Sequence, residues 1–148
     1  MSKRIVLAIL AVFLTWSVLD FVIHGLILQS TYEATADLWR PKDEMKMGLM
    51  YLVGLISAVV FTCIYACFFR DKTIATGLGY GLLYGIAAGI GMGYGTYSVM
   101  PIPYHLALAW FLGMVVEVTL GGVILGLIFS RPCAAKGGHS AGDTDAEG

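Results

Sequence analysis

Apolar residues run along most of the chain in four long blocks, separated by short polar or proline-containing stretches. Each block is long enough to cross the hydrocarbon core of a bilayer, which takes about 20 apolar residues in a helix. The blocks predict transmembrane helices over residues 5–28, 47–69, 74–100 and 104–129. We therefore expect an all-α polytopic membrane protein, a bundle of four transmembrane helices that forms a single domain over residues 1–129.

The stretches between the blocks predict how the helices are connected. Two connections are short, so the helices that they join should run antiparallel. The longest connection, QSTYEATADLWRPKDEM, predicts a short interfacial helix through Tyr32 and Trp39 that Pro41 would end. Residues 130–148 are small, polar and rich in glycine, which is typical of a disordered tail.

Composition and charge agree with this class of protein. Hydrophobic residues make up 58% of the chain and charged residues 13%, and the net charge of −1 gives no reason to expect a nucleic-acid partner. The lipid bilayer is the expected partner. Cytoplasmic loops of membrane proteins carry an excess of Lys and Arg. One side of the predicted bundle carries more of these residues than the other, which predicts both termini, and the tail, in the cytoplasm: Lys3, Arg4, Arg70, Lys72, Arg131 and Lys136 against Arg40, Lys42 and Lys46.

The third block is unusually rich in glycine. Its stretch GLGYGLLYGIAAGIGMGYG would be a poor soluble helix, because each glycine costs roughly 1 kcal/mol relative to alanine. In a membrane, small residues spaced four apart let two helix backbones approach closely. Five glycines have that spacing and predict a packing stripe for a helix of the same bundle or of another copy: Gly77, Gly81, Gly85, Gly89 and Gly93.

Two acidic residues lie inside the blocks, Asp20 and Glu117. Charged groups are rare at membrane depth and usually mark a functional site. In WSVLDFVIHG, Trp16, Asp20 and His24 recur every fourth residue, so the carboxylate and the imidazole share a helix face. Asp20, His24 and Glu117 therefore predict a polar interior that would relay protons or cations. The alternative is a protonated acid that bonds to a hydroxyl group of a neighbouring helix.

A second histidine, His105, begins the fourth block, at a depth similar to that of His24. Two imidazoles could ligate haem, and imidazole with methionine sulfur suits copper. A redox or metal-binding protein that uses His24 and His105 is therefore an alternative to a protein with no cofactor.

At WSVLDFVIHG, followed by LWRPKDEM, the chain resembles short four-span bacterial inner-membrane proteins of unknown function. The resemblance extends over roughly residues 5–129. It implies a four-helix bundle in a bacterial inner membrane, and it implies neither an activity nor a functional residue.

The sequence contains no catalytic signature such as H-E-x-x-H. The leading hypothesis is thus a non-enzymatic membrane protein that packs or oligomerises through its third span and has a polar interior. A structural or assembly subunit of a larger membrane complex is a further alternative.

Overall fold

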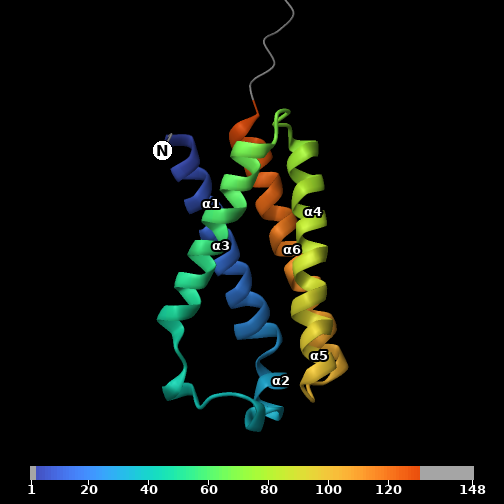
Figure 1. Cartoon of the computed structure of the whole chain (residues 1–148). Helices are drawn as coiled ribbons and strands as arrows, with labels where there is room; N and C mark the ends of the chain where they lie inside the picture. Colours follow the sequence, from blue (N-terminus) through green and yellow to red (C-terminus); the bar gives the residue numbers. More distant parts are fainter. Residues whose placement is uncertain (1–2, 131–148) are drawn as a thin grey trace, which may run out of the picture.

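The computed structural model describes residues 3–130 of the chain. Within these residues the protein contains helices and no strands, so the prediction of an all-α four-helix bundle is confirmed. Four helices are long and apolar enough to cross a membrane, which makes the chain a multi-pass membrane protein (Figure 1). They are Lys3–Ile27, Met47–Phe68, Ile74–Val99 and Tyr104–Phe129. The tail expected over residues 130–148 lies outside the described residues, apart from Ser130.

Two of the four spans are uninterrupted α-helices, and the other two each contain a π-helical stretch. A π-helical stretch widens the backbone locally, and such stretches occur frequently at functional sites. The sequence pattern gave no sign of either one. The uninterrupted helices are α3 (Met47–Phe68) and α6 (Tyr104–Phe129). The others are α1 (Lys3–Asp20) with η1 (Phe21–Ile27), and α4 (Ile74–Ile90) with η4 (Gly91–Gly95) and α5 (Thr96–Val99).

The two ends of the bundle differ. We call the end with Lys3, the α3–α4 turn and Ser130 the termini side, and the end with the 28–46 connection the loop side (Figure 1). The 28–46 connection contains one turn-sized helix and two short 3₁₀ segments. These are α2 (Gln29–Ala34), η2 (Ala36–Leu38) and η3 (Lys42–Glu44).

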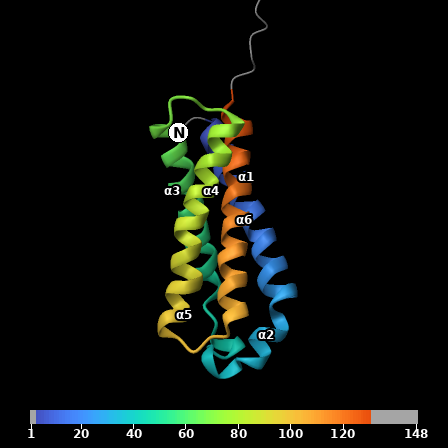
Figure 2. The ribbon, with the colours of Figure 1, turned by 90° about the vertical axis from the view of Figure 1, so that its right-hand side faces the viewer.

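The predicted interfacial helix is shorter than expected, because it ends at Ala34 and not at Pro41. The backbone N–H of Thr35 bonds to the carbonyls of Thr31 and Tyr32, and the chain then folds back on itself. The Trp39 indole N–H donates to the Thr35 hydroxyl at 2.9 Å. This folded segment covers the loop-side ends of the first and fourth spans (Figure 2).

The glycine stripe of α4 lies directly against α6 in the same chain (Figure 2). A Cβ atom on Gly81 would lie 2.5 Å from the carbonyl oxygen of Val118, and one on Gly93 would lie 2.5 Å from that of Ala107. Gly122 and Gly126 of α6 meet α4 in the same way. The two backbones therefore touch, and no side chain larger than hydrogen fits between them at these positions.

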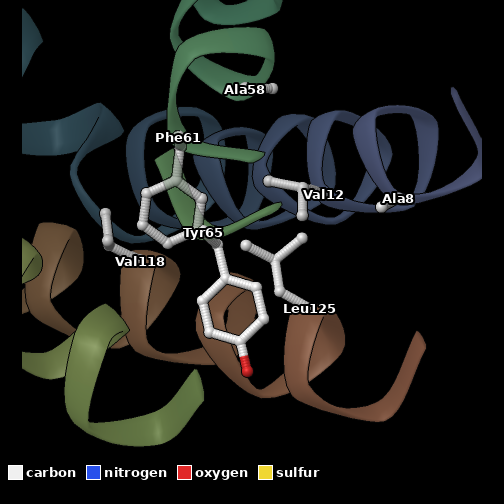
Figure 3. Close-up of a cluster of buried hydrophobic side chains, with 7 residues drawn as sticks. All are labelled: Ala8, Val12, Ala58, Phe61, Tyr65, Val118 and Leu125. Carbon is white, nitrogen blue, oxygen red and sulfur yellow. The ribbon is translucent and has the colours of Figure 1, made fainter. Parts of the chain in front are cut away.

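A buried cluster fills the centre and the termini-side half of the bundle. Figure 3 shows side chains of α1, α3 and α6 pointing toward one another within it. Tyr65 and Phe61 are its largest fully buried members. Tyr80 of α4 extends the cluster by stacking on Phe61, with ring centroids 4.6 Å apart. The cluster consists of Ala8, Val12, Ala58, Phe61, Tyr65, Val118 and Leu125.

Helix α3 packs along only part of its length. It crosses α1 near Gly54, where a Cβ would lie 3.7 Å from the Phe13 ring. On the loop side of this crossing α3 diverges from the other spans (Figure 1). Residues 47–57 are exposed on every face of the helix, with Gly54 as the one partly buried position. The loop-side half of the bundle is thus formed by three packed spans and one that leans away.

Candidate functional site

A chain of polar side chains runs from the first span to the loop-side surface. His24 lies in η1, and its Nε2 is 3.8 Å from Oδ1 of Asp20, the last residue of α1. The other ring nitrogen, Nδ1, is 2.6 Å from the hydroxyl of Tyr32 in α2. That hydroxyl also accepts a hydrogen bond of 2.8 Å from the indole N–H of Trp110 in α6. The Tyr32 hydroxyl therefore joins the neighbouring η1 to α6, which is distant in sequence.

These contacts determine the tautomer of neutral His24. An indole N–H is only a donor, so the Tyr32 hydroxyl accepts from Trp110 and is free to donate its own proton. The acceptor is then Nδ1 of His24, and the remaining ring proton lies on Nε2, on the side of Asp20. The Asp20 carboxylate on that side favours the tautomer with the proton on Nε2.

Tyr32 is held in place by stacked and edge-on aromatic rings. Trp39 meets it edge-on, with centroids 5.5 Å apart, and also contacts Trp110 at 6.0 Å. The partly buried setting raises the pKa of Tyr32 above its ordinary value. The hydrogen bond from Trp110 lowers this pKa, and the nearby charge of Asp20 raises it further. The Tyr32 hydroxyl therefore keeps its proton over the whole physiological pH range.

Asp20 is the most open member of the chain, with 58% of its side chain exposed. It lies one turn after Trp16, which faces α6, and two turns after Phe13, which faces α3. Its place on the helix is between these two directions, so it faces the interior of the bundle. The side chain is exposed because α3 has already diverged at this level.

Glu117 lies on the facing helix α6 and is far more buried than Asp20. The residue is only 6% exposed, and its Oε1 has no hydrogen-bond partner within residues 3–130. Its backbone carbonyl accepts the indole N–H of Trp16 at 2.8 Å. Ile23 of η1 contacts α6 one turn away, at Gly113. Asp20 lies between Trp16 and Ile23 in sequence, so the two acids occupy the same segment of the α1–α6 interface.

The structure thus joins part of the predicted relay group. Asp20 and His24 lie next to each other, and Glu117 bonds to neither of them. Tyr32 and Trp110 complete the chain and were not identified as site residues in the sequence. No spacing rule connects them, because they are separated by 78 positions and meet only after α2 folds onto α6.

The two histidines predicted as metal ligands both contact α2. His24 contacts Tyr32, and Nε2 of His105 lies 3.4 Å from the Thr31 hydroxyl. Residues 3–130 contain no group of three or more His, Cys, Asp or Glu side chains placed to hold a metal ion.

The polar chain is closed off on the termini side. On the termini side of Glu117, the space between the helices is filled by the buried cluster described above (Figure 3). The hydroxyl groups of Tyr65 and Tyr80 in this region donate to the backbone carbonyls of Thr73 and Phe61, both at 3.0 Å. One hydroxyl thus bonds to the α3–α4 turn and the other to the backbone within α3, and neither extends the chain from Asp20.

No family model, no curated protein and no solved structure matches the chain. The function of the protein is therefore inferred from the contacts of its own side chains.

Proposed function

We propose that this is a non-enzymatic membrane protein that binds and exchanges a proton from the loop side of the membrane. Asp20, His24 and Tyr32 form the exchanging chain, and Glu117 is the buried proton-holding acid. The observation that carries the proposal is the contact of Asp20 with His24 inside the first span, continued by the hydrogen bond between His24 and Tyr32 at the loop-side end of that span. Intramembrane ionisable groups that contact one another are typical of proton pathways.

The roles follow from the surroundings of each group. Asp20 is open, so protons reach it from the loop side. Glu117 is buried and unpartnered, and a buried carboxylate costs far more free energy than the neutral acid. Glu117 therefore holds a proton at rest. A small cation at Asp20 would use the same opening, but the proton fits the donor and acceptor order of His24 and Tyr32 better.

The site is one-sided in this proposal. The apolar and aromatic cluster on the termini side of Glu117 supports binding and release of the proton on the loop side rather than its passage across the bilayer. We also place the protein in a bacterial inner membrane with both termini in the cytoplasm, on the basis of the resemblance and of the Lys and Arg distribution.

Infrared spectroscopy of the full-length protein in lipid vesicles tests the proposal. A protonated buried carboxyl gives a separate C=O stretching band, which we expect at neutral pH and which Glu117→Gln should remove. The pH dependence of the band should shift in Asp20→Asn, because the neighbouring charge is lost. Asp37→Asn, an exposed acid in η2, is the matched control. Absence of the band, or an unchanged band in both membrane variants, would eliminate the proposed site.

A further inference from the structure

Apart from Gly54, which faces the Phe13 ring of α1, the loop-side half of α3 (residues 47–57) is exposed, and its surface is apolar except for Ser57 and the Tyr51 hydroxyl. At about 1.5 Å per residue, residues 47–57 expose roughly 16 Å of helix on all sides. The surface of this segment that faces away from the bundle can contact lipid. The surface that faces the other spans lies across from α4.

Helix α4 presents small residues to the same space. Its face toward α3 is marked by Tyr80 and Tyr84, whose rings contact Phe61. One and two turns further toward the loop side, this face continues as Ala87 and Gly91, both exposed. A Cβ on Gly91 would meet nothing within 4 Å. Exposed small residues beside a diverging helix leave room for another helix to approach the α4 backbone.

By its helix position, between the directions of Phe13 and Trp16, Asp20 points toward the side on which α3 diverges and gives that side a carboxylate. Its distance of 3.8 Å to His24 is longer than a hydrogen bond, and His24 is charged only when protonated. An acid at membrane depth pairs with a basic group, with backbone or with water, because lipid tails cannot solvate it. The occupant that complements both the apolar walls and the carboxylate is a helix that carries a basic side chain.

We propose that a transmembrane helix of a different protein docks between the loop-side halves of α3 and α4, with a Lys or Arg paired to Asp20. A second copy of this chain does not fit the charge, because its spans contain no Lys or Arg after Arg4. The docking surface consists of residues 47–57, Ala87, Gly91 and Asp20. This surface shares Asp20 with the proposed proton site and adds a partner helix to it, and it does not involve Glu117.

Designed helices test this surface without knowledge of the natural partner. The probe is a synthetic Leu/Ala transmembrane peptide with one Lys about 10 Å from its loop-side end. This position matches the depth of Asp20, which lies seven residues before Ile27, the end of the first span. The matched peptide has Leu in place of Lys. Binding to the full-length protein in lipid vesicles is measured by energy transfer to an acceptor dye on the peptide. The donors are the three tryptophans of the chain, Trp16, Trp39 and Trp110.

The Lys peptide should bind about tenfold more tightly than the Leu peptide, the range of a polar contact between membrane helices. Asp20→Asn should abolish this difference. Gly91→Leu should weaken binding of both peptides, whereas Gly79→Leu, an open glycine on the opposite face of α4, should not. Equal binding of the two peptides, equal effects of the two leucine variants, or binding blocked by self-association of the chain would overturn the proposal. Glu117→Gln should leave peptide binding unchanged, so this surface and the proton site can fail separately.

Discussion

The termini-side and loop-side halves of the bundle are built from the same four helices but are held together differently. In the termini-side half, large rings fill the space between α3, α4 and α6, and their hydroxyl groups bond to backbone carbonyls. In the loop-side half, α3 leans away, and α2 joins the first and fourth spans. Hydrogen bonds of His24, Tyr32 and Trp110 and a second apolar cluster around Leu106 hold this junction.

The contrast shows how one chain can be both rigid and chemically open in a bilayer. Association of helices in lipid depends on close packing, since lipid tails are as apolar as the side chains. The α4–α6 pair satisfies this over its whole length through glycine. The α4–α6 pair is packed closely in both halves, so the bundle stays together although α3 diverges in the loop-side half.

The largest expected effect on the free energy of unfolding is at the α4–α6 interface. Gly81→Leu places a side chain where a Cβ already lies 2.5 Å from the Val118 carbonyl oxygen, so α4 and α6 must separate. We expect a loss of about 3 kcal/mol or more in the free energy of unfolding, measured by SDS titration in mixed micelles. Gly79→Leu, with nothing within 4 Å of its Cβ, should unfold like the wild type. Similar losses in both variants would show that the α4–α6 contact is not special.

The next effect compares the two halves of a single helix. Phe61→Ala removes a ring of α3 that is 1% exposed, stacked on Tyr80 and in contact with Tyr84. A loss of about 3 kcal/mol is expected from the cavity and the lost contacts. Leu52→Ala, in the same helix but 51% exposed, should change the same unfolding midpoint by less than about 0.5 kcal/mol. A large effect of Leu52→Ala would mean that something in the preparation covers the loop-side half of α3.

The sequence was sufficient for the fold class and insufficient for the site. Apolar runs of this length have essentially one solution in lipid, a helix, which is why four spans could be predicted from composition and length. The spacing of Gly77 to Gly93 also indicated a packing stripe. It could not say whether the partner was internal, because spacing describes one helix face and not what meets it.

The site depended on features with no local signal. The pairing of Tyr32 with Trp110 needs the 28–46 connection to fold back, and helix α2 ends at Ala34 rather than at Pro41. The π-helical stretch at His24 likewise has no signal in the sequence FVIHGLI. Asp20 and His24 were placed together because they are one turn apart, which is the one part of the site that is local.

The smallest effect tests whether the loop-side chain is closed to water. Burial raises the pKa of Tyr32 above 10.0, so in the folded protein its hydroxyl stays neutral where the unfolded chain ionises. Above that pH the unfolded state then binds fewer protons than the folded state. The contribution of Tyr32 to the free energy of unfolding is therefore fully present below that pH and is lost as the pH rises through the pKa of Tyr32 in the folded protein. The difference in tyrosinate absorbance between the wild type and Tyr32→Phe isolates this group, because the other tyrosines are common to both. We expect no difference in tyrosinate absorbance between the two proteins at pH 10, and a difference that appears only at higher pH. Titration at the ordinary value would mean that water reaches the hydroxyl, and that His24 is open from the loop surface as well as from Asp20.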